Sequence, residues 1–368
     1  MIYFDHNAAT PVDARVIEAM LPYITSFYAN PSSLYKMGRM VRSAIDTARE
    51  QVSSLVDVSP SQIVFTSGGT EANNLALSLL GKHVAIAISN TEHPSITEKS
   101  DQWNNYKNII NVDEQGNVKA ESFLNLLNVS NPPQLVSVML ANNETGVIQD
   151  IARIASLLKP ENILIHTDAV QAIGKIPVSF SQLGVDLMSL SSHKIYGPKG
   201  CGALVVDKNI AVTPQVIGGG QELGWRAGTE NVAAIVGFGK AAELALQELD
   251  ARADHCLALR RKLEEGLKTI PNVTIFSEQV LRLPNTVQFS IKGIDGEMLL
   301  MQLDQQNIAV SSGSACASGA GKPSAVLTAM GVDSQIAKGA IRISLGKDNT
   351  ETEVKQFIKV LKSFLIKD

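Results

Sequence analysis

Cysteine is scarce in this sequence, whose 368 residues contain only Cys201, Cys256 and Cys316. Three cysteines this far apart exclude a disulfide framework and lack the paired spacing of a zinc site, so we expect no metal centre. No stretch approaches the roughly 18 consecutive apolar residues of a membrane span. The first residues show no basic segment followed by an apolar run, so we expect no signal peptide and a cytoplasmic protein without membrane contact.

An excess of charge of one sign is also lacking. The formal net charge is -4, and no run of lysine and arginine occurs, which argues against a surface dedicated to nucleic acid. Hydrophobic residues make up 45% of the chain and charged residues 18%, as in a globular protein with a substantial core. The length allows two domains, or one large α/β unit with an appendage.

Helical and strand patterns alternate through the first two thirds of the chain. We expect strands over 62–66, 83–89 (apolar in alternation), 135–140, 163–168 and 185–190, and helices over 41–55 and from 67–71 through 80. This alternation predicts βαβ units and a largely parallel sheet, with ligand groups beyond the carboxyl ends of its strands. One long charged helix is expected over 241–267, and then a smaller α+β part with strands over 287–291 and 340–345 and helices over 296–304 and 352–365.

The most informative segment is residues 186–200. It begins as an apolar strand, continues through Ser191, Ser192, His193 and Lys194, and ends in a Gly-Pro-Lys-Gly turn. A lysine held at a strand end loses ammonium solvation, lowers its pKa and becomes an amine that forms a Schiff base. Hydroxyls and an imidazole beside it could hold a phosphate, and the combination indicates pyridoxal phosphate. A surface turn with a solvated lysine is the alternative.

Other positions fit that cofactor. Asp168 ends an apolar strand, where an ionised carboxylate needs a cationic partner such as a protonated pyridine nitrogen, and Gln171 could reach the phenolic oxygen. His93, between a strand and a proline, has a fixed direction and could stack on the ring; a structural histidine is the alternative. Residues 68–70 offer backbone N–H groups and a hydroxyl to an anion, unless they form an ordinary helix cap.

Two more residues fit a substrate. The guanidinium of Arg342, in an apolar strand, suits a carboxylate, although a salt bridge to a neighbouring helix would explain it too. Cys316 lies in residues 311–321, which contain only small side chains, so we expect it on an exposed, mobile loop, where a thiol is costly unless it is used. Cys201 lies in an apolar pattern and Cys256 in a helical one, and both are expected to be buried residues that pack in the interior without a chemical role.

In combination, these motifs resemble the cysteine desulfurases of the NifS and IscS type, in the class V, fold-type I group of pyridoxal-phosphate enzymes. The similarity runs from residue 2 to residue 346. It is carried by six ordered motifs: TEH at 91–93, NNETG at 142–146, HTDAVQ at 166–171, SSHKIYGPKG at 191–200, RAGT at 226–229 and SSGSAC at 311–316. The resemblance implies a large cofactor-binding α/β domain over 13–252, with a mainly parallel sheet flanked by helices. A small α+β domain over 1–12 and 253–368 would carry the cysteine loop.

The resemblance also implies a role for each cofactor residue. Lys194 would hold pyridoxal phosphate as a Schiff base, Asp168 would pair with the pyridine nitrogen and Gln171 with the phenolic oxygen, and the catalytic His93 would stack on the ring. The phosphate would be bound by Gly69, Thr70, Ser191 and His193. Thr229 would reach the phosphate in the neighbouring subunit, which implies an obligate homodimer.

For the substrate, the resemblance implies L-cysteine, with its carboxylate oriented by Asn143, Arg342 and Asn7. Lys194 would remove the α-proton, and Cys316 would attack the sulfur and carry it as a persulfide while alanine is released. The acceptor would be a scaffold or sulfur-carrier protein in iron–sulfur assembly, transfer-RNA thiolation or DNA sulfur modification. A selenocysteine lyase or another class V enzyme is the alternative, and a non-catalytic scaffold would have lost Lys194, Asp168 or Cys316.

Overall fold

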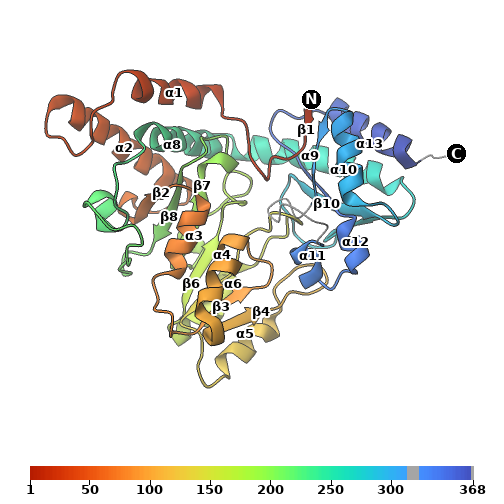
Figure 1. Ribbon diagram of the computed structural model, residues 1–368, viewed down its shortest axis with the longest axis horizontal. Coiled ribbons are helices and arrows are strands. Elements are labelled where there is room, and N and C mark those ends of the chain that lie inside the picture. The colour runs from red at the N-terminus through yellow and green to blue at the C-terminus, as the bar shows by residue number, and fades with distance from the viewer. Residues whose placement is uncertain (313–322, 366–368) are drawn as a thin grey trace.

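The computed structural model describes residues 1–312 and 323–365. Cys316 therefore lies outside the described residues. Figure 1 shows a large α/β part at one side and a smaller part, built from both ends of the chain, at the other. Among the described residues, none of the helices is both long and apolar enough to cross a bilayer.

A seven-stranded sheet forms the centre of the larger part, with the strand order β2-β8-β7-β6-β5-β3-β4. Its strands are β2 (Ile63–Thr66), β3 (Ile86–Ser89), β4 (Lys107–Ile110), β5 (Leu135–Ser137), β6 (Leu164–Asp168), β7 (Leu187–Ser191) and β8 (Gly202–Val206). Only β8 runs antiparallel to its neighbours, so the prediction of a largely parallel sheet is confirmed.

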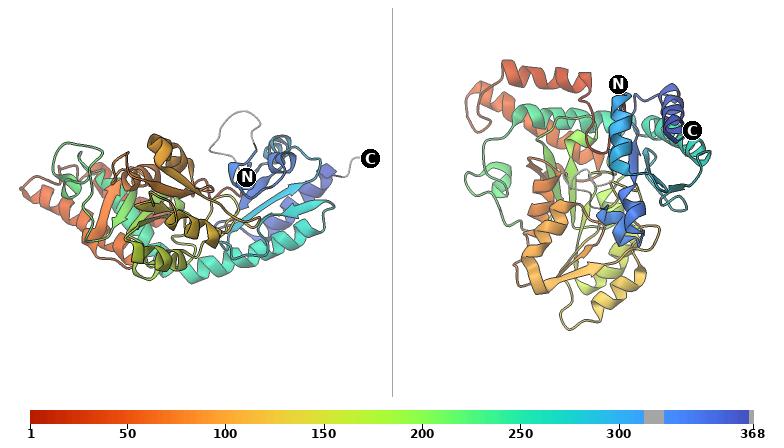
Figure 2. Two further views of the ribbon diagram at one scale, coloured as in Figure 1. Left: turned by 90° about the horizontal axis from the view of Figure 1, so that it is seen from below. Right: turned by 45° about the vertical axis from the view of Figure 1, so that its right-hand side comes forward.

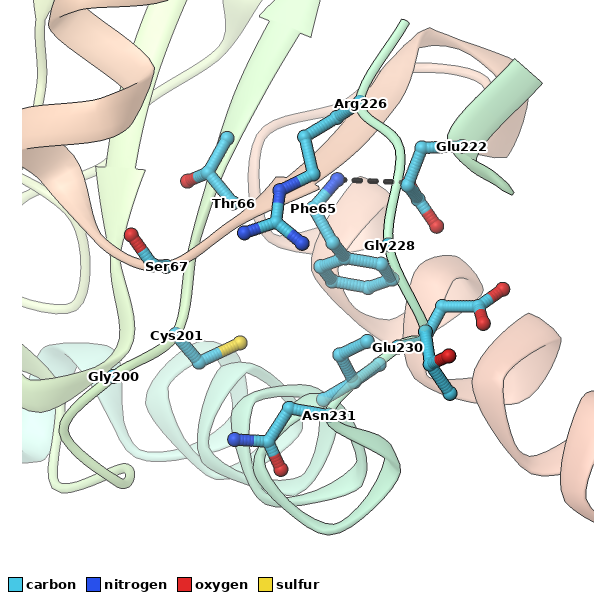
Figure 3. A pocket seen from close by; sticks show the side chains of 12 residues that line it. Phe65, Thr66, Ser67, Gly200, Cys201, Glu222, Arg226, Gly228, Glu230 and Asn231 are labelled. Atoms are coloured by element: carbon cyan, nitrogen blue, oxygen red, sulfur yellow. Dashed lines mark hydrogen bonds between the residues drawn. The ribbon is translucent and has the colours of Figure 1, made fainter. Parts of the chain in front are cut away.

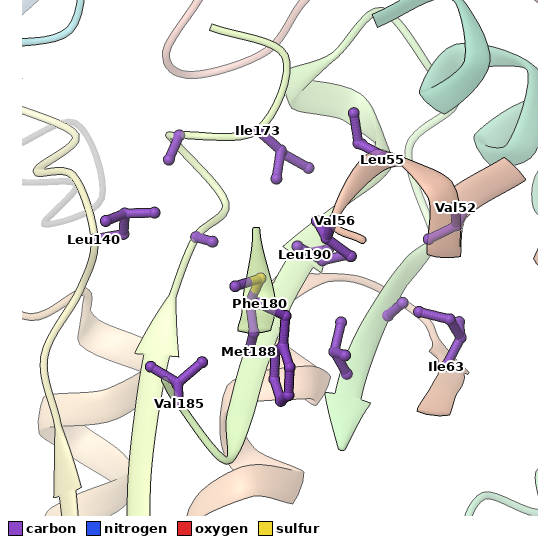
Figure 4. Close-up of a cluster of buried hydrophobic side chains, with 14 of the residues drawn as sticks. Val52, Leu55, Val56, Ile63, Leu140, Ile173, Phe180, Val185, Met188 and Leu190 are labelled. Carbon is purple, nitrogen blue, oxygen red and sulfur yellow. The ribbon is translucent and has the colours of Figure 1, made fainter. Parts of the chain in front are cut away.

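Helices cover both faces of this sheet, so inner strands such as β3, β5 and β8 are buried on both sides, whereas the edge strand β4 is partly exposed. The helices are α1 (Ala14–Thr25), α2 (Lys36–Leu55), α3 (Gly69–Leu77), α4 (Pro94–Ser100), α5 (Ala120–Leu127), α6 (Ile151–Leu158), α7 (Phe180–Leu183) and α8 (Val232–Gln247). Met188 and Leu190 of β7 join the core cluster drawn in Figure 4, whereas Leu187 joins the cluster on the opposite face. This alternation follows from the period of two along a strand.

The smaller part contains a four-stranded antiparallel sheet in the order β12-β13-β10-β9. Its elements are α9 (Leu249–Lys268), β9 (Val273–Ile275), β10 (Thr286–Ile291), α10 (Gly296–Gln305), β11 (Ile308–Ala309), β12 (Ser311–Ser312), α11 (Ala325–Ala329), α12 (Ser334–Lys338), β13 (Ile341–Ser344) and α13 (Glu351–Leu365). The N-terminal strand β1 (Ile2–Tyr3) pairs with β11, and Phe4 lies in the same core as Phe289 and Phe357. The views of Figure 2 show both chain ends in this part. The domain boundaries at 12/13 and 252/253 remain a prediction.

Three expectations about local structure were wrong. The strand expected over 135–140 ends already at Ser137. The helix expected over 241–267 is two helices, α8 and α9, because Glu248 between them has φ -105° and ψ 9°. A one-residue break leaves the apolar periodicity almost unchanged, so the pattern does not reveal it. The strand expected over 83–89 begins only at Ile86, and its residues are all buried rather than alternately exposed, because β4 and β5 flank it and helices cover both faces.

Candidate active site

The carboxyl ends of the parallel strands open into a cavity of about 530 Å³. Polar residues follow strands here as predicted: Asp168 is the last residue of β6, and Lys194 ends the short 3₁₀ turn Ser192–Lys194 after β7. All predicted site residues except Thr229 and Cys316 line this cavity, namely Asn7, Gly69, Thr70, His93, Asn143, Asp168, Gln171, Ser191, His193, Lys194 and Arg342. The topology therefore collects residues that span nearly the whole chain.

Lys194 is held from the N-terminal segment. Its Nζ donates to the main-chain oxygens of Asn7 and Ala8, the latter at 2.8 Å. The turn that carries it is tight, because a Cβ on Gly197 would lie 2.0 Å from Ser192 Oγ, so only glycine fits there. Lys194 is half-buried in the cavity, and the alternative of a solvated surface turn is wrong.

Asp168 is buried at the end of β6. Its Oδ2 accepts from Asn73 Nδ2 at 2.7 Å and its Oδ1 from the backbone N–H of Val170 at 2.9 Å. Among the described residues, no cationic side chain forms an ion pair with it. A buried carboxylate without a cation calls for one from a ligand, and a protonated pyridine nitrogen would meet that need.

His93 is fixed by the N-terminus of α4. Its Nδ1 accepts from the backbone N–H of Ser95 at 3.1 Å, so the neutral ring carries its proton on Nε2. The hydroxyl of Ser95 accepts from Asn73 Nδ2 at 2.9 Å, the same amide group that donates to Asp168. Ser95 Oγ also lies 2.8 Å from His93 Nδ1, so Asn73 contacts Asp168 directly and His93 through Ser95.

The opposite side of the cavity suits an anion. The start of α3 provides backbone N–H groups without intrahelical partners, and Ser191 Oγ lies 2.9 Å from His193 Nδ1. A Cβ on Gly69 would come within 2.9 Å of Val170 Cγ2, so the helix start packs closely against the turn after β6. Burial, together with Lys194 and Lys199, lowers the pKa of His193 to about 4, and a bound phosphate would oppose that shift by favouring the imidazolium.

Arg342 in β13 provides a buried guanidinium at the cavity. Its Nη2 donates to Asp5 Oδ1 at 2.5 Å and its Nη1 to Asn143 O at 3.1 Å. Its Nε is buried without a partner among the described residues. These two bonds use only two of the five N–H groups of the guanidinium, so a residue that lines the cavity retains donors for a ligand. Arg342 is also paired in register with Ser311 of β12, immediately before residues 313–322, and Pro323, just after them, lines the cavity.

Asn7 is saturated by protein contacts. Its Nδ2 donates to Asn143 O at 3.1 Å and to Thr286 Oγ1 at 2.9 Å, which uses both amide hydrogens. Its Oδ1 accepts from Lys175 and from Asn285. In this arrangement no amide hydrogen of Asn7 is available to a substrate, so its role in substrate binding remains a prediction without support from the hydrogen bonds.

Thr229 lies apart from this cavity. It is exposed and lines a second hollow of about 240 Å³. Figure 3 shows this hollow and the hydrogen bond that the backbone N–H of Phe65 donates to Glu222. Arg226, which also lines the hollow, pairs with Glu71. A contact between Thr229 and a cofactor in another subunit therefore remains a prediction. Burial raises the pKa of Cys256 to about 11 and raises that of Cys201 as well, so both thiols are protonated at neutral pH.

Sequence reasoning missed several polar residues of the site. Glu92 is buried, accepts from the backbone N–H of Met139 at 2.7 Å, and has its pKa raised well above the usual value by burial. Glu144 accepts from Ser324 Oγ at 2.6 Å, beside the end of 313–322. Asn73, Lys175 and Asp5 were missed too. A spacing signal existed for Asn73, which follows the predicted Thr70 by three residues in α3, about one helical turn on the same face. Lys175 follows Gln171 by four residues, but this segment is a turn and not a helix.

The comparisons with known proteins cover almost the whole chain. Residues 2–357 match the family described as Aminotransferase class-V. The chain is 41% identical over 371 residues to Cysteine desulfurase IscS of Methanosarcina thermophila, with 98% of this chain and 91% of that protein covered. It is 40% identical to Cysteine desulfurase IscS of Dictyoglomus turgidum, with 100% and 95% covered.

Solved structures are similar as well. The NifS-like protein of Rickettsia africae superposes with a TM-score of 0.92 at 40% identity, with 99% of each chain covered. SspA, solved in complex with cysteine, has a TM-score of 0.81 at 30% identity, with 95% of this chain and 100% of that chain covered.

Proposed function

Because this chain belongs to the class-V aminotransferase family, we propose that it is a pyridoxal-phosphate-dependent cysteine desulfurase that converts L-cysteine to L-alanine and carries the sulfur on Cys316. The observation that supports this most directly is the cavity itself. Within residues 1–312 and 323–365, it combines a half-buried lysine, a buried carboxylate without an ion-paired cation, and an arginine that has an unpartnered N–H. These groups suit the aldehyde and pyridine nitrogen of the cofactor and the carboxylate of an amino acid. Relatives and solved structures over the full length point the same way.

The donors present fit the cofactor. Lys194 would hold it covalently, Asp168 would pair with its pyridine nitrogen, and His93 would lie against its ring. The residues for its phosphate are Gly69, Thr70, Ser191 and His193. When bound, pyridoxal phosphate supplies an electron sink for the charge that develops on the substrate Cα.

The chain's own residues would carry out the remaining steps. Arg342 orients the substrate carboxylate through a charge-assisted hydrogen bond, and the Lys194 amine takes the proton from the substrate Cα. The thiolate of Cys316 then attacks the substrate sulfur, so that an S–S bond forms as the C–S bond breaks. The electron pair of that bond stays with the substrate, whose Cβ takes up a proton, and the Lys194 amine returns a proton to Cα, which gives alanine. Cys316 keeps the sulfur as a persulfide.

A homodimer would complete the site. The exposed side of α1 carries Ile17, Leu21 and Ile24, each more than half exposed, in one stripe at helical spacing. Tyr28, just beyond the end of α1, is exposed as well. Contiguous exposed apolar residues mark interaction surfaces, and a second copy of the chain would cover them. Thr229 is exposed in the hollow near Cys201, where it could serve the partner's cofactor. We propose that the dimer is cytoplasmic and passes its sulfur to an acceptor protein, such as an iron–sulfur scaffold or a sulfur carrier.

The test is alanine formation from L-cysteine by the purified protein. The wild type is expected to show a visible cofactor absorption band and to form alanine, and Lys194→Ala is expected to lose both. Cys316→Ser is expected to keep the band and lose desulfuration. Mass spectrometry of wild type quenched during turnover would find one extra sulfur atom on the peptide of Cys316. A protein that takes up no pyridoxal phosphate, or a Cys316→Ser variant with full activity, would contradict the proposal.

A further inference from the structure

A second lysine lies inside the site, and none of the roles above uses it. Lys175 follows Gln171 by one turn, and its Nζ donates to Gln171 Oε1 at 2.7 Å and to Asn7 Oδ1 at 2.8 Å. The chain reaches this position through Gly174, which has φ +67° and whose Cβ, if present, would lie 2.8 Å from Ile195 Cγ2. The backbone is therefore shaped to bring Lys175 behind Gln171.

The amide of Gln171 can take only one orientation between its two partners. Lys175 is a donor to its oxygen, and the main-chain oxygen of Asn7 accepts from its Nε2 at 2.9 Å. If the amide were flipped, its Nε2 would face the Nζ of Lys175, which is also a donor, and its Oε1 would face the main-chain oxygen of Asn7, which is also an acceptor. Because Nε2 carries two hydrogens and Asn7 takes one, the second is available on the cavity side, where Gln171 forms part of the wall.

Asn7 connects the same lysine to Lys194. The side chain of Asn7 accepts from Lys175, and its main-chain oxygen accepts from Lys194. Among the described residues, no carboxylate pairs with Lys175, so its amino group is committed to these two amide oxygens. Burial first, and then the charge of Lys194, lower the pKa of Lys175 well below its usual value. The other charged or titratable groups that act on it are Cys256 in α9 and Arg342 in β13, and Lys175 in turn acts on His6.

We propose that Lys175 is a positioning residue. It holds Gln171 with an N–H donor toward the phenolic oxygen of the cofactor, and it holds the side chain of Asn7, whose main-chain oxygen accepts from Lys194. The inference rests on the proposed function, since it takes pyridoxal phosphate as the ligand. Lys175 touches neither cofactor nor substrate in this scheme and acts through Gln171 and Asn7. Without it, the oxygen of Gln171 is left in a buried position without its donor, and the amide is free to turn.

The test uses the holoenzyme and compares Lys175→Met with Lys240→Met. Lys240 is a matched control because it is also half-buried but pairs with Glu243 on α8, away from the cavity. We expect Lys175→Met to bind pyridoxal phosphate about tenfold more weakly, the effect of one hydrogen bond of about 1.4 kcal/mol. The pH midpoint of the cofactor's absorption band is expected to rise, because Gln171 no longer holds an N–H donor toward the phenolic oxygen, and the more basic oxygen then favours the protonated form of the Lys194 nitrogen. Lys240→Met is expected to change neither.

A double-mutant cycle separates positioning from a general loss of stability. In the Gln171→Leu background, Lys175→Met is expected to weaken cofactor binding much less than it does in the wild type, because the part of its effect that passes through the Gln171 amide is already missing and only the part through Asn7 remains. Lys175→Arg keeps N–H donors at this position and is expected to retain more of the affinity for pyridoxal phosphate than Lys175→Met. It also provides a test if Lys175→Met does not fold. An unchanged affinity and pH midpoint in Lys175→Met, or an equal loss in the Gln171→Leu background, would overturn the inference. A wild type without cofactor uptake would instead overturn the proposed function and this inference with it.

Discussion

Replacing Arg342 with methionine is expected to weaken binding of the substrate carboxylate and to leave binding of the amine unchanged. The guanidinium uses Nη2 for Asp5 and Nη1 for Asn143 O, and its Nε has no partner among the described residues. A hydrogen bond to a charged group contributes about 1.5–3 kcal/mol, which corresponds to about 10- to 150-fold in a dissociation constant. That range applies only to ligands that carry the carboxylate.

The assay compares the inhibition constants of L-alanine and ethylamine, which differ only in the carboxylate. We expect Arg342→Met to raise the constant for L-alanine by about 10- to 150-fold and to leave that for ethylamine unchanged. Arg282→Met is the matched control, because Arg282 is another buried arginine, paired with Glu264 away from the cavity. Equal weakening of both inhibitors in Arg342→Met would show that the variant distorts the site, and the assignment of Arg342 to the carboxylate would then be refuted.

Three further outcomes follow from buried polar contacts. Burial lowers the pKa of His166 to about 4, so as pH falls below 6.5 the unfolded chain binds a proton that the folded chain does not. The free energy of unfolding, measured with urea, therefore falls between pH 7 and pH 4, and it is expected to fall by up to about 3 kcal/mol less in His166→Gln than in the wild type. Asn73→Leu removes the 2.7 Å donor to Asp168 and is expected to speed cofactor loss during dialysis by about tenfold, whereas unaltered retention would contradict that coupling. Ser324→Ala leaves the buried Glu144 without its 2.6 Å donor and is expected to destabilise the protein by about 1–3 kcal/mol, measured by thermal unfolding; an unchanged melting temperature would argue against this contact.

Local patterns were enough to predict the framework of the site. Apolar runs that end in polar residues indicate β6 and β7, and because the carboxyl ends of parallel strands meet at one edge of a sheet, they also predict that Asp168 and Lys194 lie close together. The same rule accounts for His93 after β3. These predictions succeeded because each depends on residues that are adjacent in the chain, where a strand period or a helix start is visible directly.

Contacts between distant segments were beyond that reasoning. Nothing in residues 1–10 indicates that Asn7 accepts from Lys194, 187 residues away, or that both amide hydrogens of Asn7 are already used. The sequence around Lys175 does not distinguish it from a solvent-exposed lysine after a turn. The apolar run of β8 does not indicate whether that strand is parallel or antiparallel to its neighbours.

The sequence by itself therefore determined the class of fold, the chemistry of the cavity and the family, because these depend on periodicity and on motifs of adjacent residues. Only the tertiary structure decided which donors are already satisfied and which are available. That distinction depends on hydrogen-bond partners that the fold brings together from the two ends of the chain, as Arg342 and Asp5 show. The sequence shows the same asparagine or arginine whether the N–H groups of its side chain are bonded within the protein or remain available to a ligand. Only the positions of the neighbouring atoms distinguish the two cases.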